Sequence, residues 1–176
     1  MILEKEKLEM IPLTMDFAFK RVFDLNPNLL KRFLICVLKL DLDEETTDMR
    51  MGNTELTKTY EKEYQKRVDI IVEFDDKITV DLEINTGSLR SFHQRNVLYG
   101  TKIYSTMFEK GKIRSDFSDY YMYQLNLNTK PDHNGFGERE CFLMDTNTYE
   151  IQTENLKFVH KFLGYYRTYI IMMLKM

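Results

Sequence analysis

Two acidic residues, Asp69 and Glu83, lie in neighbouring segments whose composition is typical of β-strands. The first segment, VDIIVEF, begins at Val68, and the second, ITVDLEIN, ends at Asn85. A short polar connection, DDK at 75–77, joins them, and this arrangement predicts a β-hairpin. Two carboxylates that are held close together can bind a hard divalent cation such as Mg²⁺, which prefers oxygen ligands.

The alternation of side chains along the two strands fixes which residues face each other. Successive side chains of a strand point to opposite faces, so the apolar residues of both strands must share one face. The simplest register that achieves this closes Phe74 against Ile78. Counting back in this register sets Asp69 opposite Glu83, with Cβ atoms about 5 Å apart. Because two carboxylates at that distance repel each other, the register predicts a cation between them.

The hairpin also has an interpretation that involves no chemistry. Many surface hairpins carry Asp and Glu on the face that meets water. Asp69 and Glu83 would then be solvated residues of an α/β domain with an unrelated activity. The residue pattern alone leaves both interpretations open.

Length, composition and charge restrict the class of protein. The 176 residues, 43% of them hydrophobic, fit a single domain (1–176) with a buried core. Cys36 and Cys141 are far apart, and His133 and His160 lack metal-ligand spacing, so neither a disulfide framework nor a zinc site is indicated. We therefore expect a cytoplasmic protein, and no apolar run approaches the ~20 residues of a membrane span. The net charge of −3 requires a local excess of basic residues on any DNA-binding face.

The hydrophobic pattern predicts helices on both sides of the hairpin. Apolar residues have helical spacing over 16–23, 29–40 and 92–108. Strands are predicted over 120–127 and 140–144, and a final helix over 155–163. This order of elements predicts an α/β (α+β) fold with a mixed β-sheet flanked by helices.

Three segments of the chain together resemble a known family in their order and spacing. They are DFAFKRVF at 16–23, RVDIIVEFDDKITVDLEIN at 67–85 and QRNVLYGTKIYS at 94–105. They are similar to the Rpn family of recombination-promoting nucleases and transposases, a branch of the PD-(D/E)xK nuclease superfamily. The resemblance implies a restriction-endonuclease-like core and Mg²⁺- or Mn²⁺-dependent hydrolysis of DNA, associated with mobile DNA and recombination. The resemblance implies DNA as a partner. A homodimer stays open as an alternative, and we expect no association with a membrane.

The resemblance also implies roles for individual residues. Asp69 and Glu83 would be metal ligands, and the backbone carbonyl of Ile84 could add a third ligand. Asp16 would be an auxiliary acid on the first helix. Asn85 stands where the superfamily usually has Lys and where this branch commonly has Gln. The chain ends where similar sequences usually continue into a further helical region, so we expect either a C-terminally short variant or a truncated product.

Because Asn85 carries no charge, a cation from elsewhere would have to contact the phosphate. The candidates for nucleic-acid binding are Arg67, which lies opposite Asn85 in the predicted register, and Arg95, Tyr99 and Lys102 on the following helix. Without such a cation the chain would be a catalytically impaired, nuclease-fold module that binds nucleic acid or protein. This module is the alternative function.

Overall fold

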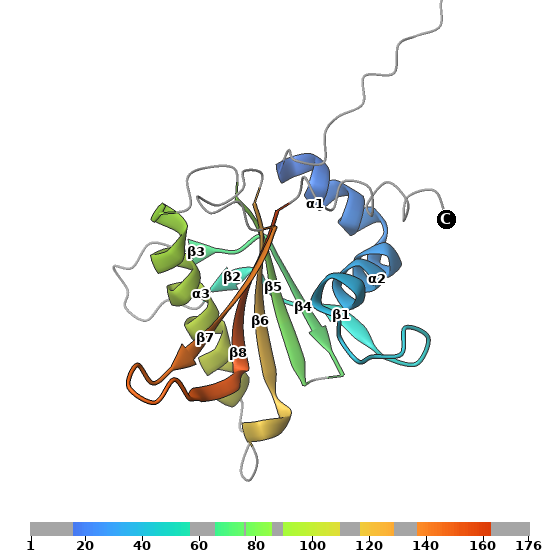
Figure 1. Ribbon diagram of the computed structural model, residues 1–176. Helices are drawn as coiled ribbons and strands as arrows, with labels where there is room; N and C mark the ends of the chain where they lie inside the picture. Colours follow the sequence, from blue (N-terminus) through green and yellow to red (C-terminus); the bar gives the residue numbers. More distant parts are fainter. Residues whose placement is uncertain are drawn as a thin grey trace, which may run out of the picture.

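The computed structural model describes residues 16–56, 66–75, 77–85, 90–109, 117–128 and 137–162. Six strands form one mixed sheet in the order β1-β4-β5-β6-β8-β7, and helices cover both of its faces (Figure 1). The six strands are β1 (Met49–Met51), β4 (Ile70–Phe74), β5 (Ile78–Asn85), β6 (Tyr121–Asn128), β7 (Glu138–Met144) and β8 (Ile151–Phe162). Two short strands, β2 (Glu55–Leu56) and β3 (Lys66–Arg67), form a second sheet.

The helices are α1 (Asp16–Leu25), α2 (Pro27–Leu38) and α3 (Arg90–Glu109), with a short 3₁₀-helix, η1 (Phe117–Asp119). The three α-helices confirm those predicted over 16–23, 29–40 and 92–108, with ends displaced by about two residues. No helix in the described ranges combines the length and the apolar character that crossing a lipid bilayer requires. The mixed sheet with flanking helices confirms the predicted fold class, and it is consistent with a restriction-endonuclease-like core.

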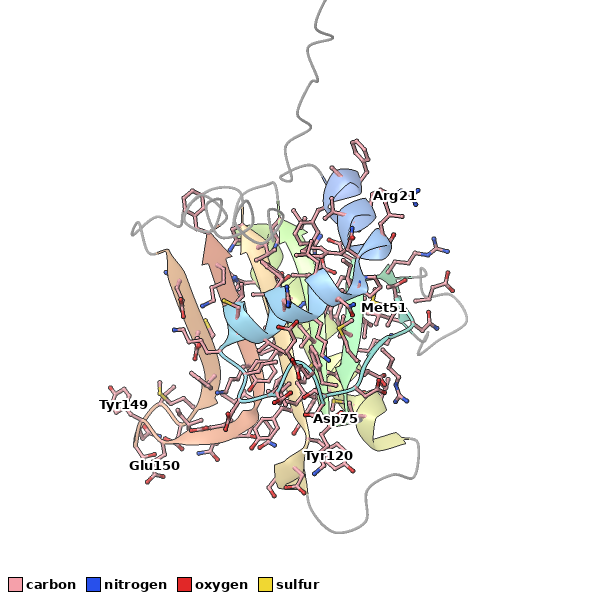
Figure 2. The ribbon with its side chains drawn as sticks, turned by 90° about the vertical axis from the view of Figure 1, so that its right-hand side faces the viewer. Arg21, Met51, Asp75, Tyr120, Tyr149 and Glu150 are labelled. Atoms are coloured by element: carbon pink, nitrogen blue, oxygen red, sulfur yellow. The ribbon has the colours of Figure 1, made fainter. Side chains whose placement is uncertain are left out.

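The three central strands β5, β6 and β8 run parallel, so their carboxyl ends meet at the same edge of the sheet. Helix α3 lies between β5 and β6 in the chain, as the crossover of parallel neighbours requires. Figure 2 shows Asp75 and Tyr120 at one end of the sheet and Arg21 of α1 at the other. In open α/β sheets, ligands bind beyond the carboxyl ends of the parallel strands. The end of the sheet near α1 is therefore the end to search for a site.

Helices α1 and α2 cover one face of the sheet with an apolar core (Figure 1). Phe19 and Phe23 are four residues apart on one side of α1, and their rings pack edge to face with centroids 4.6 Å apart. Phe33 of α2 packs against both rings. Val80 and Leu82 of β5 meet this cluster and are fully buried. This packing fixes α1 against the end of β5.

Helix α3 covers the opposite face, together with the small β2-β3 sheet (Figure 1). Ile103 of α3 packs with Met122 and Phe158 of the sheet. The helix comes closest at Gly100, where an added Cβ would lie 2.8 Å from the Phe158 ring and 2.9 Å from Oε1 of Gln124. A side chain at this position would push α3 away from the sheet.

The predicted hairpin and its register are confirmed. Phe74 pairs with Ile78, and Ile71 pairs with Asp81, as the alternation of side chains requires. The strands predicted over 120–127 and 140–144 correspond to β6 and β7. Local alternation was sufficient here because a register slip by one residue would bury the polar face of one strand against the apolar face of the other.

The helix predicted over 155–163 is wrong, because this segment belongs to strand β8. Leu156 and Val159 are three residues apart and look helical, but Leu156, Phe158 and His160 are two apart and equally fit a strand. Strand β8 pairs with β6 along one edge and with β7 along the other. Its conformation thus depends on pairing with β7, the strand directly before it, and with β6, which lies farther back in the chain.

Candidate active site

The candidate site lies at the carboxyl end of β5, where Asp69 and Glu83 are joined by two reciprocal hydrogen bonds. The backbone N–H of Asp69 donates to Oε1 of Glu83 at 3.0 Å, and the backbone N–H of Ile84 donates to Oδ2 of Asp69 at 3.0 Å. The last backbone pair between β4 and β5 is Ile70 with Leu82, the residues adjacent to Asp69 and Glu83. The two side chains therefore continue the hairpin beyond its ladder, and the predicted neighbours are indeed brought together.

Each of the two carboxylates is also paired with a basic residue, and the two basic residues come from opposite faces of the sheet. Lys20 of α1 places Nζ 2.8 Å from Oδ1 of Asp69. Arg95 of α3 places Nη2 3.4 Å from Oε2 of Glu83. The Glu83 side chain is only 5% exposed, whereas the side chains of Lys20 and Asp69 retain 34% and 20% exposure. Solvent therefore reaches Asp69 and both basic partners, since Arg95 is 37% exposed, while Glu83 itself is enclosed.

The environment of Glu83 disfavours its charged form. Burial, followed by the negative charge of Asp69, raises the pKa of Glu83 to about 7. The Asp69 backbone N–H, Arg95 and Lys20 act in the opposite direction and do not cancel the rise. Burial and the charges of Glu83 and Asp69 likewise raise the pKa of Asp81 well above its usual range. Additional positive charge between these acids would stabilise their ionised forms.

Neutral amides continue the site beneath α3. Asn85 donates from Nδ2 to Oδ1 of Asn126 at 3.0 Å, and Asn96 of α3 donates to the same oxygen at 2.7 Å. Oδ1 of Asn85 accepts a hydrogen bond from Nη2 of Arg95 at 2.9 Å. All three asparagines are at most 2% exposed. Asn85 therefore orients Arg95, and its own amide is buried rather than presented to solvent.

The acidic face of the hairpin is not a solvated surface. Asp81 is 0% exposed and Glu83 is 4% exposed, because α3 packs over this face. Oδ2 of Asp81 accepts a hydrogen bond from Nε2 of Gln124 at 3.0 Å. The interpretation of Asp69 and Glu83 as water-exposed hairpin residues is therefore wrong for Glu83, while Asp69 is partly exposed.

The predicted pairing of Arg67 with Asn85 is wrong. The chain bends at Asp69, and Arg67 belongs to β3, where it pairs with Glu55 of β2. Its guanidinium forms an ion pair with the Glu55 carboxylate. The pairing of the hairpin does not continue to the residues before Asp69, because β3 pairs with β2 in the second sheet.

The remaining sequence candidates lie at different positions along α1 and α3. Cζ of Arg95 lies 5.8 Å from the centroid of the Tyr99 ring, as their four-residue spacing predicts. Lys102 is two turns further along α3, about 10 Å from Arg95 along the helix axis. Asp16 begins α1, but its side chain lies outside the described part of the chain.

Two features of the site were not predicted from the sequence. Lys20 lies within the motif DFAFKRVF, but only the packing of α1 on the sheet shows that its ammonium reaches Asp69. His160 pairs in register with Asn126, which itself pairs with Glu83, so a polar row crosses three strands. Its ring meets that of His93 of α3 at a centroid distance of 5.5 Å. No local spacing could have placed these side chains in one row.

The donor set of Asp69 and Glu83 fits a hard divalent cation. In the ranges that the structure describes, no three His, Cys, Asp or Glu residues gather in the way that a protein-only metal cage requires. Mg²⁺ does not need such a cage, since it keeps several waters and is usually bound through one or two carboxylates and substrate phosphate. The side chain of Asp69 is 20% exposed, so waters can reach it.

Comparison with known proteins identifies the family of the chain. The model of the family described as PD-(D/E)XK nuclease family transposase matches residues 13–163, a span that includes Lys20, Asp69, Glu83 and Arg95. No curated protein matches the chain. PD-(D/E)XK nucleases generally use divalent metal ions, and a nuclease family implies DNA as the substrate. Because the family model matches most of the chain, the protein belongs to the PD-(D/E)XK nuclease family transposases.

Proposed function

We propose that this protein is a metal-dependent DNA endonuclease that acts in the recombination of mobile DNA. The observation that supports the proposal best is the reciprocal hydrogen bonding of Asp69 and Glu83 at the carboxyl end of β5. This arrangement holds two carboxylates together, although burial and the negative charge of Asp69 raise the pKa of Glu83. A site that keeps like charges together is suited to a cation that both can share.

In the proposed mechanism, Asp69 and Glu83 would hold Mg²⁺ or Mn²⁺, and the backbone carbonyl of Ile84 could add a ligand. Such an ion would supply Lewis-acid chemistry for the attack of water on the phosphodiester. The hydrogen bond from the Ile84 N–H fixes the orientation of the Asp69 carboxylate by holding its Oδ2. Asp16 is an auxiliary acid by family resemblance.

Arg95 is the residue of α3 that we place beside the phosphodiester. Its guanidinium is fixed by Glu83 and Asn85 and lies over the ring of Tyr99. A guanidinium held in this way is suited to contact two phosphate oxygens together. Asn85 is a positioning residue for Arg95, which gives the unusual asparagine a role that needs no charge.

The alternative is a nuclease-fold module that binds DNA or protein without cleaving it. The observation that favours it is the burial of Asn85, whose amide is engaged with Asn126 and Arg95 and provides no cation. Under this alternative, binding survives the loss of Glu83 and no metal ion supports cleavage.

The two functions are separated by incubating the protein with supercoiled plasmid in Mg²⁺, Mn²⁺ or EDTA. We expect nicking that requires metal and that falls at least about a hundredfold in Asp69→Asn and Glu83→Gln. Glu73→Gln is the matched control, because Glu73 lies in the same hairpin but pairs with Arg50 away from the site. Nicking that persists in EDTA, or that is equal in all variants, would contradict the proposal. DNA binding without nicking in any metal would favour the alternative.

A further inference from the structure

The two acids of the site are already neutralised in the absence of a metal ion. Asp69 is paired with Lys20, and Glu83 is paired with Arg95. With all four groups ionised, two negative and two positive charges sum to zero. A divalent cation bound to both acids changes this sum to +2. The site then attracts anions, which it does not do without the ion.

Lys20 and a metal ion compete for the same side of Asp69. Oδ2 of Asp69 accepts the hydrogen bond from the Ile84 N–H, and Oδ1 lies 2.8 Å from Nζ of Lys20. A metal ion bonded to Oδ1 would stand where the ammonium now stands, and the two cations would repel each other. Lys20 therefore has to leave Asp69 when the ion binds.

The position of Lys20 determines where its ammonium can go. Phe19 and Phe23 anchor α1 in the core, so the backbone of Lys20 stays beside the site. Both basic side chains are partly exposed, Lys20 to 34% and Arg95 to 37%. The guanidinium of Arg95 is planar and donates to both Asn85 and Glu83, whereas the ammonium of Lys20 ends a flexible four-carbon stem. The ammonium of Lys20 can therefore turn away from Oδ1 of Asp69 and still remain within reach of a bound phosphate.

We propose that Lys20 is a second cation that binds the scissile phosphate, in addition to Arg95, and that metal binding transfers its ammonium from Asp69 to the phosphodiester. This inference rests on the proposed function, because it takes the ligand of the acids to be a divalent cation. It supplies from α1 the positive charge that Asn85 lacks on β5. It also makes metal and DNA reinforce each other's binding. The metal ion releases the ammonium of Lys20 to contact the phosphate, and the phosphate in turn keeps this ammonium away from the metal-binding oxygen of Asp69.

The first test measures metal affinity in the absence of DNA, by titration of the full chain with Mn²⁺. Lys20→Met keeps the apolar stem and removes the competing charge, so we expect Mn²⁺ to bind about threefold to tenfold more tightly than to the wild type. Arg21→Met is the matched control, because Arg21 is the next residue of α1 and is exposed (Figure 2). Its Mn²⁺ affinity should equal that of the wild type. Unchanged or weaker binding by Lys20→Met would overturn the proposal.

The second test measures how strongly the ion promotes DNA binding, with saturating Ca²⁺ and a short duplex. Ca²⁺ should raise the wild-type affinity for the duplex about fivefold or more, and Lys20→Met should lose most of this increase although it binds the ion. Lys20→Arg keeps the charge and should restore part of it. An increase that is the same in the wild type and in Lys20→Met would overturn the proposal, whatever the effect on cleavage.

These readouts separate failure of this inference from failure of the proposed function. A wild-type protein that binds Mn²⁺ through Asp69 but nicks no plasmid would refute the endonuclease, while the two affinity tests would still decide the role of Lys20. Thermal unfolding of each variant checks that the fold is intact. Lys20→Gln is a second neutral variant if Lys20→Met does not fold.

Discussion

The two faces of β5 are equally buried and chemically opposite. Val80 and Leu82 face α1 and α2 and are 0% exposed, while Asp81 and Glu83 face α3 and are 0% and 4% exposed. Burial of the apolar face stabilises the fold by roughly 25 cal/mol per Å². Burial of the carboxyls opposes folding unless partners replace the lost water. One strand thus carries a face that stabilises the fold and a face that destabilises it.

Because side chains alternate along β5, one face carries the apolar residues that stabilise the fold and the other carries the acids of the proposed metal site. The acidic face keeps its partners, since Asp81 is bonded to Gln124 and Glu83 to Arg95 and the Asp69 backbone. Even so, burial and the negative charges of neighbouring acids raise the pKa values of both Asp81 and Glu83. Substitutions on the two faces should therefore have different consequences.

The largest effect on stability is expected from the apolar face. Leu82→Ala removes a fully buried side chain from the core cluster and should lower the free energy of unfolding by about 2–5 kcal/mol. Urea-induced unfolding measures this change. Mn²⁺ affinity of the folded protein should stay within about threefold of the wild type, and a loss of stability below about 1 kcal/mol would contradict the comparison.

The acidic face should make metal-free stability depend on pH. Because the folded pKa of Glu83, about 7, exceeds its usual value of 4.5, the folded state retains a proton that the unfolded chain has lost. Stability should therefore fall as the pH rises from about 4.5 to about 7, by roughly 1.4 kcal/mol per pH unit for one proton, and then level off. Unfolding in urea with EDTA between pH 5 and pH 8 measures this slope.

The matched variant Glu83→Gln should have a smaller slope, with a remainder from Asp81, whose pKa is also raised. The same slope in both proteins would show that Glu83 is not the group responsible. Mg²⁺ should reduce the slope in the wild type, because the ion stabilises the ionised carboxylates.

The fit of α3 over the acidic face is tested at Gly100. Alanine usually stabilises a helix relative to glycine by up to about 1 kcal/mol. Gly100→Ala should do the opposite and lower stability by about 1–3 kcal/mol, because the new Cβ would meet the Phe158 ring and Oε1 of Gln124. Thr101→Ala, at the exposed neighbouring position, is the control. Thermal unfolding that gives Gly100→Ala a higher midpoint than the wild type would contradict the close contact.

The smallest effect is expected where the hairpin meets water. Glu73 pairs with Arg50 at 2.6 Å, and both side chains are at least 31% exposed. Glu73→Gln should change the free energy of unfolding by less than about 1 kcal/mol and leave its pH dependence unaltered. A larger change, measured by urea unfolding, would mean that burial does not separate the two groups of acids.

The features that could be predicted from the sequence are those that depend on local alternation. The register that brings Asp69 to Glu83 follows from the apolar residues of two adjacent strands and their short connection. The bend that directs Arg67 away from Asn85 could not be predicted, because it depends on the pairing of β3 with β2, an earlier segment of the chain. Strand β8 looked helical because its apolar spacing fits both a helix and a strand, and its parallel pairing with β6 leaves no local signal. The approach of Lys20 depends on how α1 packs, which no local pattern encodes.

The most direct test of the metal site is a crystal structure of the protein soaked with Mn²⁺, using anomalous scattering to locate the ion. We predict an anomalous peak within bonding distance of both Asp69 and Glu83, with the ammonium of Lys20 displaced from Oδ1 of Asp69. Crystals of Glu83→Gln, soaked in the same way, should lack the peak. An ion bound elsewhere, or no ion with Lys20 still paired to Asp69, would contradict the proposal that these acids form a metal-dependent nuclease site.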